Sequence, residues 1–189
     1  MAPNATLFRV EVELSDVDRS KYASLELRPA RHPSESMRYL VTRTLAYCLS
    51  YEDGIAFSKG GLSSTDEPPV LVRDHLGVLV AWIDVGTPSA ARVHRASKAA
   101  QHVEIYGVSN LADLRSEAAA GRIHRAGNID VWTFEANFLD AVEARFERSL
   151  SVTLVRTEGQ LYVTIAGATL EGELAHSKLF YETSGDPAG

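Results

Sequence analysis

Alternating apolar and polar residues dominate both ends of the chain. Near the start, 6–14 (TLFRVEVEL) and 22–28 (YASLELR) alternate with the period of a half-buried strand, and the polar stretch between them is typical of a turn. We predict that these two strands pair as an antiparallel hairpin. The last third shows the same alternation in 150–156, in 160–165 and, less strongly, in 168–174. Both ends of the chain are therefore predicted to form β-structure.

Helical spacing of apolar residues takes over in the middle of the chain. With Pro33 at the first helical position, a helix is predicted to begin there and to be ended by 51–54 (YEDG). Further helices are predicted after Pro88, over 110–122 and over 135–148. The apolar stripe of the first helix consists of Met37, Leu40, Val41, Thr44, Leu45, Cys48 and Leu49.

The segment from Thr65 to Ser109 combines a hairpin, a helix and a further strand. Its hairpin strands are 68–74 and 77–85, joined by a two-residue turn, and the second strand is apolar on both faces, as a central covered strand is. A right-handed crossover through the helix favours a parallel arrangement of 102–108 beside 77–85. Two more strands are predicted over 55–59 and 129–134.

Composition is that of an ordinary globular protein. The chain has 189 residues, 45% hydrophobic and 23% charged, which suits a single domain over 1–189. A net charge of −6 argues against coating nucleic acid, so such a partner would need a local basic patch. The sequence shows no secretory signal and no apolar run of about 20 residues that would span a membrane. The single Cys48, interpreted as a core residue, fits a cytoplasmic location.

Two acidic residues are predicted to converge at the start and the end of the central hairpin. If Asp74 pairs with Gly77, Glu67 lies directly opposite Asp84, and two carboxylates in that position repel each other. Asp84 also lies in an apolar run, where an uncompensated charge is costly. A proton, a cationic side chain or a metal ion is expected to offset that cost. Asp66 would take the place of Glu67 if the register slipped by one residue.

The order of elements and acids resembles the nuclease fold of the PD-(D/E)XK superfamily, and the chain resembles the YaeQ family more closely. The resemblance implies an α/β fold with a three-layer, restriction-endonuclease-like core, a mixed central β-sheet flanked by helices, and additional N- and C-terminal strands. The residues that carry it are 30–35 (ARHPSE), 57–62 (FSKGGL), 66–68 (DEP), 74–77 (DHLG), 82–86 (WIDVG), Arg92 and 95–96 (RA).

The nuclease resemblance implies a Mg²⁺ or Mn²⁺ ion held by Glu67 and Asp84. Such nucleases place a lysine two residues after the second acid, but here the triplet is DVG and the lysine is missing. Lys59 is the first candidate to replace it, because its strand should run antiparallel to 68–74 and end near Glu67. Arg92, one turn into the next helix, is the second, although arginine is a poor proton acceptor.

Glu35 has two interpretations that we consider equal. It can supply a third acid from the first helix, as in related nucleases, or it can satisfy free amides and complement the helix dipole.

Arg95 and Lys98 belong to a basic face of the helix after Pro88, together with Arg92 and His94. This face could contact phosphate and hence nucleic acid, but we favour the simpler interpretation of a solvated helix face. Two functions stay open at this point. One is a metal-dependent phosphodiesterase; the other is an inactive nuclease-like fold that serves as a binding module, with its acids tied to Lys59 and Arg92.

Overall fold

The computed structural model describes residues 5–58, 67–109 and 111–181. Its helices are α1 (Met37–Leu49), α2 (Ala90–Ala99), α3 (Ala112–Ala119) and α4 (Ala136–Glu143), and η2 (Ala126–Asn128) is a 3₁₀ turn. Its strands are β1 (Thr6–Leu7), β2 (Arg9–Asp16), β3 (Lys21–Leu27), β4 (Ala30–Arg31), β5 (Ile55–Phe57), β6 (Val70–Arg73), β7 (Leu79–Val85), β8 (His102–Gly107), β9 (Ile129–Phe134), β10 (Ser149–Thr157), β11 (Gln160–Ile165) and β12 (Ala168–Lys178).

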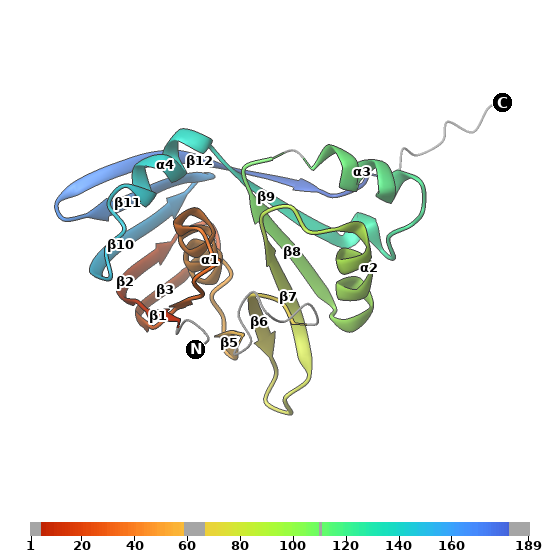
Figure 1. Cartoon of the computed structure of the whole chain (residues 1–189), viewed down its shortest axis with the longest axis horizontal. Coiled ribbons are helices and arrows are strands. Elements are labelled where there is room, and N and C mark those ends of the chain that lie inside the picture. The colour runs from red at the N-terminus through yellow and green to blue at the C-terminus, as the bar shows by residue number, and fades with distance from the viewer. Residues whose placement is uncertain (1–4, 59–66, 110, 182–189) are drawn as a thin grey trace.

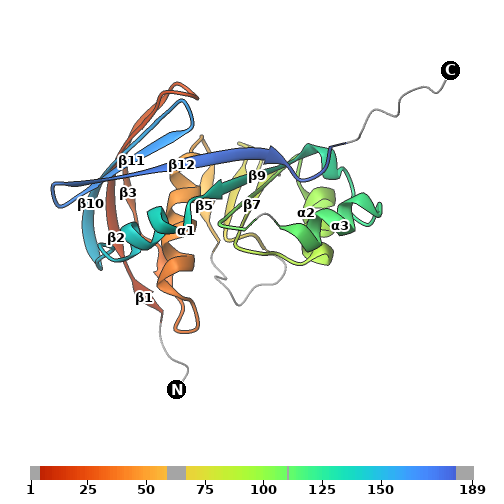
Figure 2. The same cartoon turned by 90° about the horizontal axis from the view of Figure 1, so that it is seen from above.

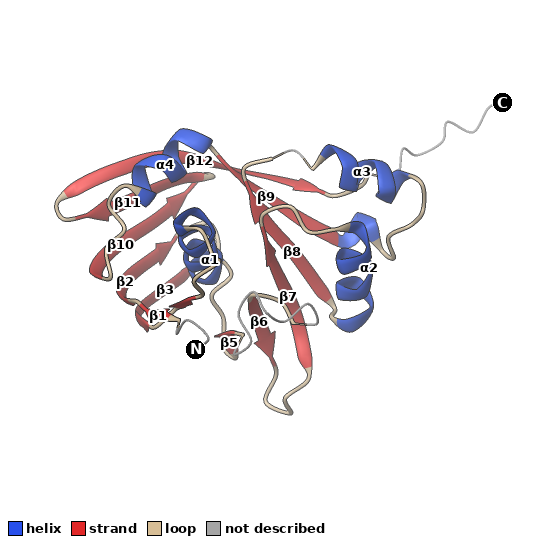
Figure 3. Ribbon diagram, in the orientation of Figure 1, coloured by secondary structure: helices blue, strands red, loops and turns tan. Residues whose placement is uncertain are grey.

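Ten of the described strands form one mixed sheet in the order β3-β2-β10-β11-β12-β9-β8-β7-β6-β5. The sheet bends into two halves that open like a V, with α1 between them (Figures 1 and 3). β12 belongs to both halves, because its first residues pair with β11 and its last with β9. It can be followed across the molecule in Figure 2. The large mixed sheet flanked by helices that the sequence predicts is confirmed.

The half-sheet that contains β2, β3, β10 and β11 follows the alternation of apolar and polar residues in the sequence. β2 and β3 pair antiparallel, as predicted, and the apolar residues of β2 point to the buried side. β10 joins β2 in parallel, which places strands from the first and the last third of the chain side by side in one half-sheet. The weak strand predicted over 168–174 is longer than expected and continues to Lys178, because β9 becomes its partner where the pairing with β11 ends.

The predicted start of α1 at Pro33 is wrong. Ser36 is the N-cap, and its hydroxyl accepts the amide of Tyr39 at 3.1 Å. A tight turn precedes it, in which the amide of Glu35 donates to the carbonyl of His32 at 2.9 Å. The predicted stripe is largely buried, but so are Thr42, Arg43 and Ala46 on its other sides, since α1 packs against both half-sheets.

The β7–α2–β8 crossover is confirmed. β8 runs parallel to β7, with Trp82 beside Val103, and β9 continues the parallel order. α2 and α3 cover the face of these strands opposite α1, where Val93 and Ala96 pack on Trp82 and Ile105. The predicted helices over 110–122 and 135–148 are present as the shorter α3 and α4. Within the described ranges, no helix has the length and apolarity that crossing a bilayer requires.

The predicted register of the β6–β7 hairpin is wrong by two residues. Val70 pairs with Ile83, so continuing the ladder by one residue would put Pro69, and not Glu67, beside Asp84. The turn is longer than two residues because the amide of Asp74 donates to the carbonyl of Val78, while Gly77 adopts a left-handed φ of 81°. The carboxylate of Asp74 stabilises this turn by accepting the amides of Leu76 and Val78, each at 2.9 Å.

Candidate functional site

The carboxylate of Asp84 is held by two side chains on the α2 side of the sheet. Trp82 and Asp84 are two residues apart on β7 and share a face, and the indole Nε1 of Trp82 donates to Oδ2 at 2.9 Å. Ser89 caps α2 and so places Arg92 at the start of the helix. Arg92 Nε lies 2.9 Å from both carboxylate oxygens, and Nη2 lies 2.9 Å from Oδ1. Asp84 is only 3% exposed, so this ion pair is largely shielded from water.

Arg92 also connects Asp84 to the segment that carries Glu67. Its Nη2 donates to the main-chain carbonyl of Glu67 at 2.9 Å, and its guanidinium lies 5.3 Å from the ring centre of Trp82. The carboxylate of Glu67 has a different partner, the hydroxyl of Ser58, at 2.9 Å. The two acids predicted to face each other are therefore close to the same guanidinium, but their carboxylates have separate partners.

Glu35 is buried at 2% exposure and is paired with Arg43 of α1. Arg43 Nη2 lies 2.9 Å from Oε1 of Glu35 and also donates to the carbonyl of Ala30 at 2.8 Å. The amide of His32 donates to Oε2 at 3.0 Å, so Glu35 satisfies a backbone amide, as one of its two interpretations predicts. Burial raises the pKa of Glu35, and the charge of Arg43 opposes that shift in part.

Tyr39 of α1 connects the two ion pairs electrostatically. Burial raises the pKa of Tyr39 to about 12, and the negative charge of Asp84 adds to the shift, as does that of Glu35, while Arg43 and Arg92 oppose it. The charges of Glu35, Asp84 and Arg92 therefore all influence the pKa of one phenol.

Two members of this centre were missed by sequence reasoning. The signal for Trp82 is its position two residues before Asp84 on a strand, which puts both side chains on one face. Arg43 lies inside an otherwise apolar and threonine-rich stretch of α1, and a charge at such a position signals a buried partner.

The remaining predicted residues are Lys59, Asp66, Arg95 and Lys98. Lys59 and Asp66 lie outside the residues that the structure describes. Arg95 and Lys98 are exposed on the outer side of α2, as the helical phase predicts. In the described ranges, no group of three or more His, Cys, Asp or Glu side chains is arranged to hold a metal ion.

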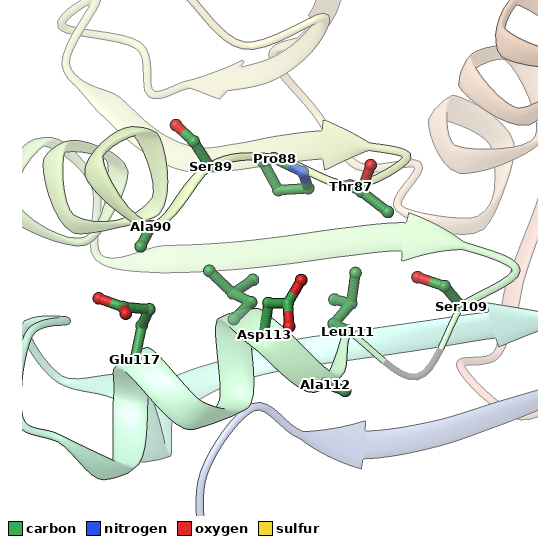
Figure 4. A pocket seen from close by; sticks show the side chains of 10 residues that line it. Thr87, Pro88, Ser89, Ala90, Ser109, Leu111, Ala112, Asp113 and Glu117 are labelled. Carbon is green, nitrogen blue, oxygen red and sulfur yellow. The ribbon is translucent and has the colours of Figure 1, made fainter.

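A cavity of about 490 Å³ lies beside the segments that follow β7 and β8 (Figure 4). It separates the start of α2, with Ser89 and Ala90, from α3, which presents Asp113 and Glu117. Ser109 lines it, and its hydroxyl has no hydrogen-bond partner among the described residues.

Comparison with known proteins identifies the family. A sequence model described as YaeQ protein matches residues 1–174. The YaeQ proteins of Salmonella typhi and Escherichia coli strain K12, both described as uncharacterised, are each 28% identical over 176 residues, which is 92% of this chain and 96% of each relative. Crystal structures of YaeQ from Xanthomonas axonopodis pv. citri and Pseudomonas syringae have TM-scores of 0.79 and 0.80 at 27% identity; they cover 90% of this chain and 97% and 94% of those chains. The chain therefore belongs to the YaeQ family.

Proposed function

We propose that this chain is a binding protein whose acidic centre has a structural role, and that it is not a metal-dependent phosphodiesterase. The observation that carries this proposal is the position of Arg92, 2.9 Å from both carboxylate oxygens of Asp84. Arginine stays protonated at all ordinary pH values. The permanent positive charge of Arg92 therefore already neutralises Asp84, the carboxylate that a divalent cation would need as a ligand.

The donor set of this centre does not fit Mg²⁺ or Mn²⁺ in this arrangement. These ions require carboxylate oxygens that are free to coordinate. Both oxygens of Asp84 accept hydrogen bonds from Arg92 or Trp82, and Glu35 is paired with Arg43. Arg92 cannot accept a proton from an attacking water, so it does not replace the missing motif lysine as a base. The resemblance to PD-(D/E)XK nucleases is consistent with a common fold in which ion pairs stand at the metal positions.

One observation favours the phosphodiesterase as a second candidate. Glu35, Asp84 and Arg92 all influence the pKa of Tyr39, which supports a common site for acids from the α1 region and from the end of β7. A divalent cation would then have to displace Arg92 from Asp84.

Calorimetric titration with Mn²⁺ separates the two functions. We expect no specific binding by the wild-type protein. The comparison variants are Asp84→Asn, which removes the proposed ligand, and Asp53→Asn, which removes an exposed acid from the turn before β5. Stoichiometric binding that is lost in Asp84→Asn and kept in Asp53→Asn would overturn the binding-protein proposal.

A cleavage assay provides a second, independent test of the two functions. DNA and RNA substrates are incubated with the same three proteins in Mg²⁺ or Mn²⁺. We expect no cleavage, or a background that is equal in all three proteins and so comes from a contaminant. Cleavage that disappears only in Asp84→Asn would establish the phosphodiesterase instead.

A further inference from the structure

Positive charge is concentrated on one part of an otherwise acidic protein. The whole chain has 19 Lys and Arg against 25 Asp and Glu, but residues 86–128 contain six basic and three acidic residues. Of those three acids, Glu104 accepts hydrogen bonds from Ser50 and Tyr106 on the α1 side of the sheet, away from α2. A polyanion that approaches the α2 side therefore meets a surface of opposite sign.

A contact between two histidines joins the basic residues of α2 to those of the loop before η2. The amide of His124 donates to Nδ1 of His94 at 3.3 Å, which brings the segment 122–125 beside α2. Lys98 lies one turn after His94 on the same side of the helix. Lys98 and Arg125 are exposed and form no ion pair with any residue in the described ranges, so both charges are available to a ligand.

Arg125 also lines a cavity of about 600 Å³ that has the chemistry to hold an aromatic anion. Phe180 and Tyr181 line the same cavity, as does Lys178. The hydroxyl of Tyr181 accepts the amide of Lys178 at 3.0 Å, which holds the phenol in place although it is 63% exposed. Arg125 itself has a left-handed φ of 49°, which is uncommon for a residue other than glycine.

We infer that this surface, formed by Lys98, His94, His124 and Arg125 with the adjoining aromatic cavity, binds single-stranded nucleic acid. Lys98 and Arg125 contact successive phosphates, and an unstacked base enters the cavity against Tyr181. Aromatic side chains beside a cationic track are the usual combination for binding single strands without strong sequence preference. A duplex keeps its bases stacked inside the helix and offers none to the cavity. The inference goes beyond the proposed function, which names no ligand.

The test is fluorescence anisotropy with labelled homopolymers of about 12 nucleotides, within the usual site size. The arms are single-stranded RNA, single-stranded DNA, a duplex of the same length and polyglutamate. We expect both single strands to bind at low salt and the duplex and the peptide to bind at least tenfold more weakly. The tighter-binding of the two single strands identifies whether the surface binds RNA or DNA. Equal binding of duplex or polyglutamate would overturn the inference.

Three variants assign the binding to this surface. Lys98→Ala with Arg125→Ala should weaken binding at least tenfold and reduce the slope of log K against log salt by about 1.4, since two phosphate contacts are lost. Tyr181→Ala should weaken binding about tenfold with the slope unchanged, because it removes only stacking. The matched control, Lys21→Ala with Arg145→Ala, removes two exposed cations from elsewhere and should bind as the wild type does.

The outcomes are separable from those of the proposed function. No binding by the wild type, or an equal loss in the control variant, would overturn the nucleic-acid surface alone. Cleavage that depends on Asp84 would overturn the proposed function and leave the assignment of this surface intact.

Discussion

Arg92 and Asp84 tie the first turn of α2 to the end of β7 through a guanidinium that contacts both oxygens of one carboxylate. Because Asp84 is almost fully buried, Arg92→Ala would leave a charge without its partner. We expect the free energy of unfolding in urea to fall by about 3 kcal/mol, at the low end for a broken buried pair because Arg92 is itself partly exposed. Lys98→Ala, an exposed cation of the same helix, should change it by less than about 0.5 kcal/mol. Equal stability of the two variants would contradict a structural role for this ion pair.

The pH dependence of stability should reveal the burial of Glu35. Its pKa is raised above the ordinary value of 4.5, mainly by desolvation, so the folded state retains a proton that the unfolded state has already lost. The stability contributed by this group is therefore highest below pH 4.5 and falls as the pH rises through the raised pKa. Measured by urea unfolding, the stability of the wild type relative to Glu35→Gln should fall over that range and then level off.

The control for this experiment is Glu26→Gln. The pKa of Glu26 is lowered, first by its hydrogen bond with Arg28, so its contribution is present above pH 4.5 and is lost as the pH falls. The two variants should therefore differ from the wild type with opposite pH slopes. Slopes of the same sign would mean that Glu35 is not desolvated.

Tyr39 should report the charge of Asp84 across the sheet edge. Its pKa is about 12, raised first by burial and then by Asp84. In Asp84→Asn the second contribution disappears, so we expect the pKa of Tyr39 to fall, as followed by NMR of tyrosine labelled at the ring carbon. The pKa of Tyr47, raised by burial and by other neighbours, should not move. An unchanged Tyr39 would show that the two residues are farther apart than the structure places them.

Gly172 of β12 packs directly under Phe138 of α4. A Cβ at this position would lie 2.5 Å from Cγ of the phenylalanine ring, so Gly172→Ala forces the helix and the strand apart. We expect a loss of about 1–3 kcal/mol in unfolding free energy, as for other overpacked sites. Gly127→Ala is the control, because its Cβ would make only an ordinary contact at 3.6 Å. Phe138→Ala, which removes Cγ and the ring, should cost less stability in the Gly172→Ala background than in the wild type if the side chain of Phe138 causes the strain.

The type and order of most elements follow from neighbours along the chain. The buried face of α2, with Val93, Ala96 and Ala100, follows from helical spacing because a helix presents residues three and four apart to the same side. The parallel pairing of β7 and β8 follows from the length and handedness of the crossover. The family resemblance likewise needed only short motifs in the right order.

Other features depend on which segments pack together in the folded chain, and the spacing of apolar residues along the sequence does not predict that. The hairpin register changed by two residues because Asp74 and Gly77 stabilise a longer turn, and a shift of this size keeps every side chain on its face while changing its partner. The sequence of α1 predicts an amphipathic helix, but α1 is buried on almost every side because it packs between the two half-sheets. The ion-pair partners of Glu35 and Asp84 were also determined by which segments pack together. The apolar run around Asp84 calls for a proton, a cation or a metal ion, but only the packing of α1 and α2 decided that Arg92 pairs with Asp84 and that Arg43 pairs with Glu35.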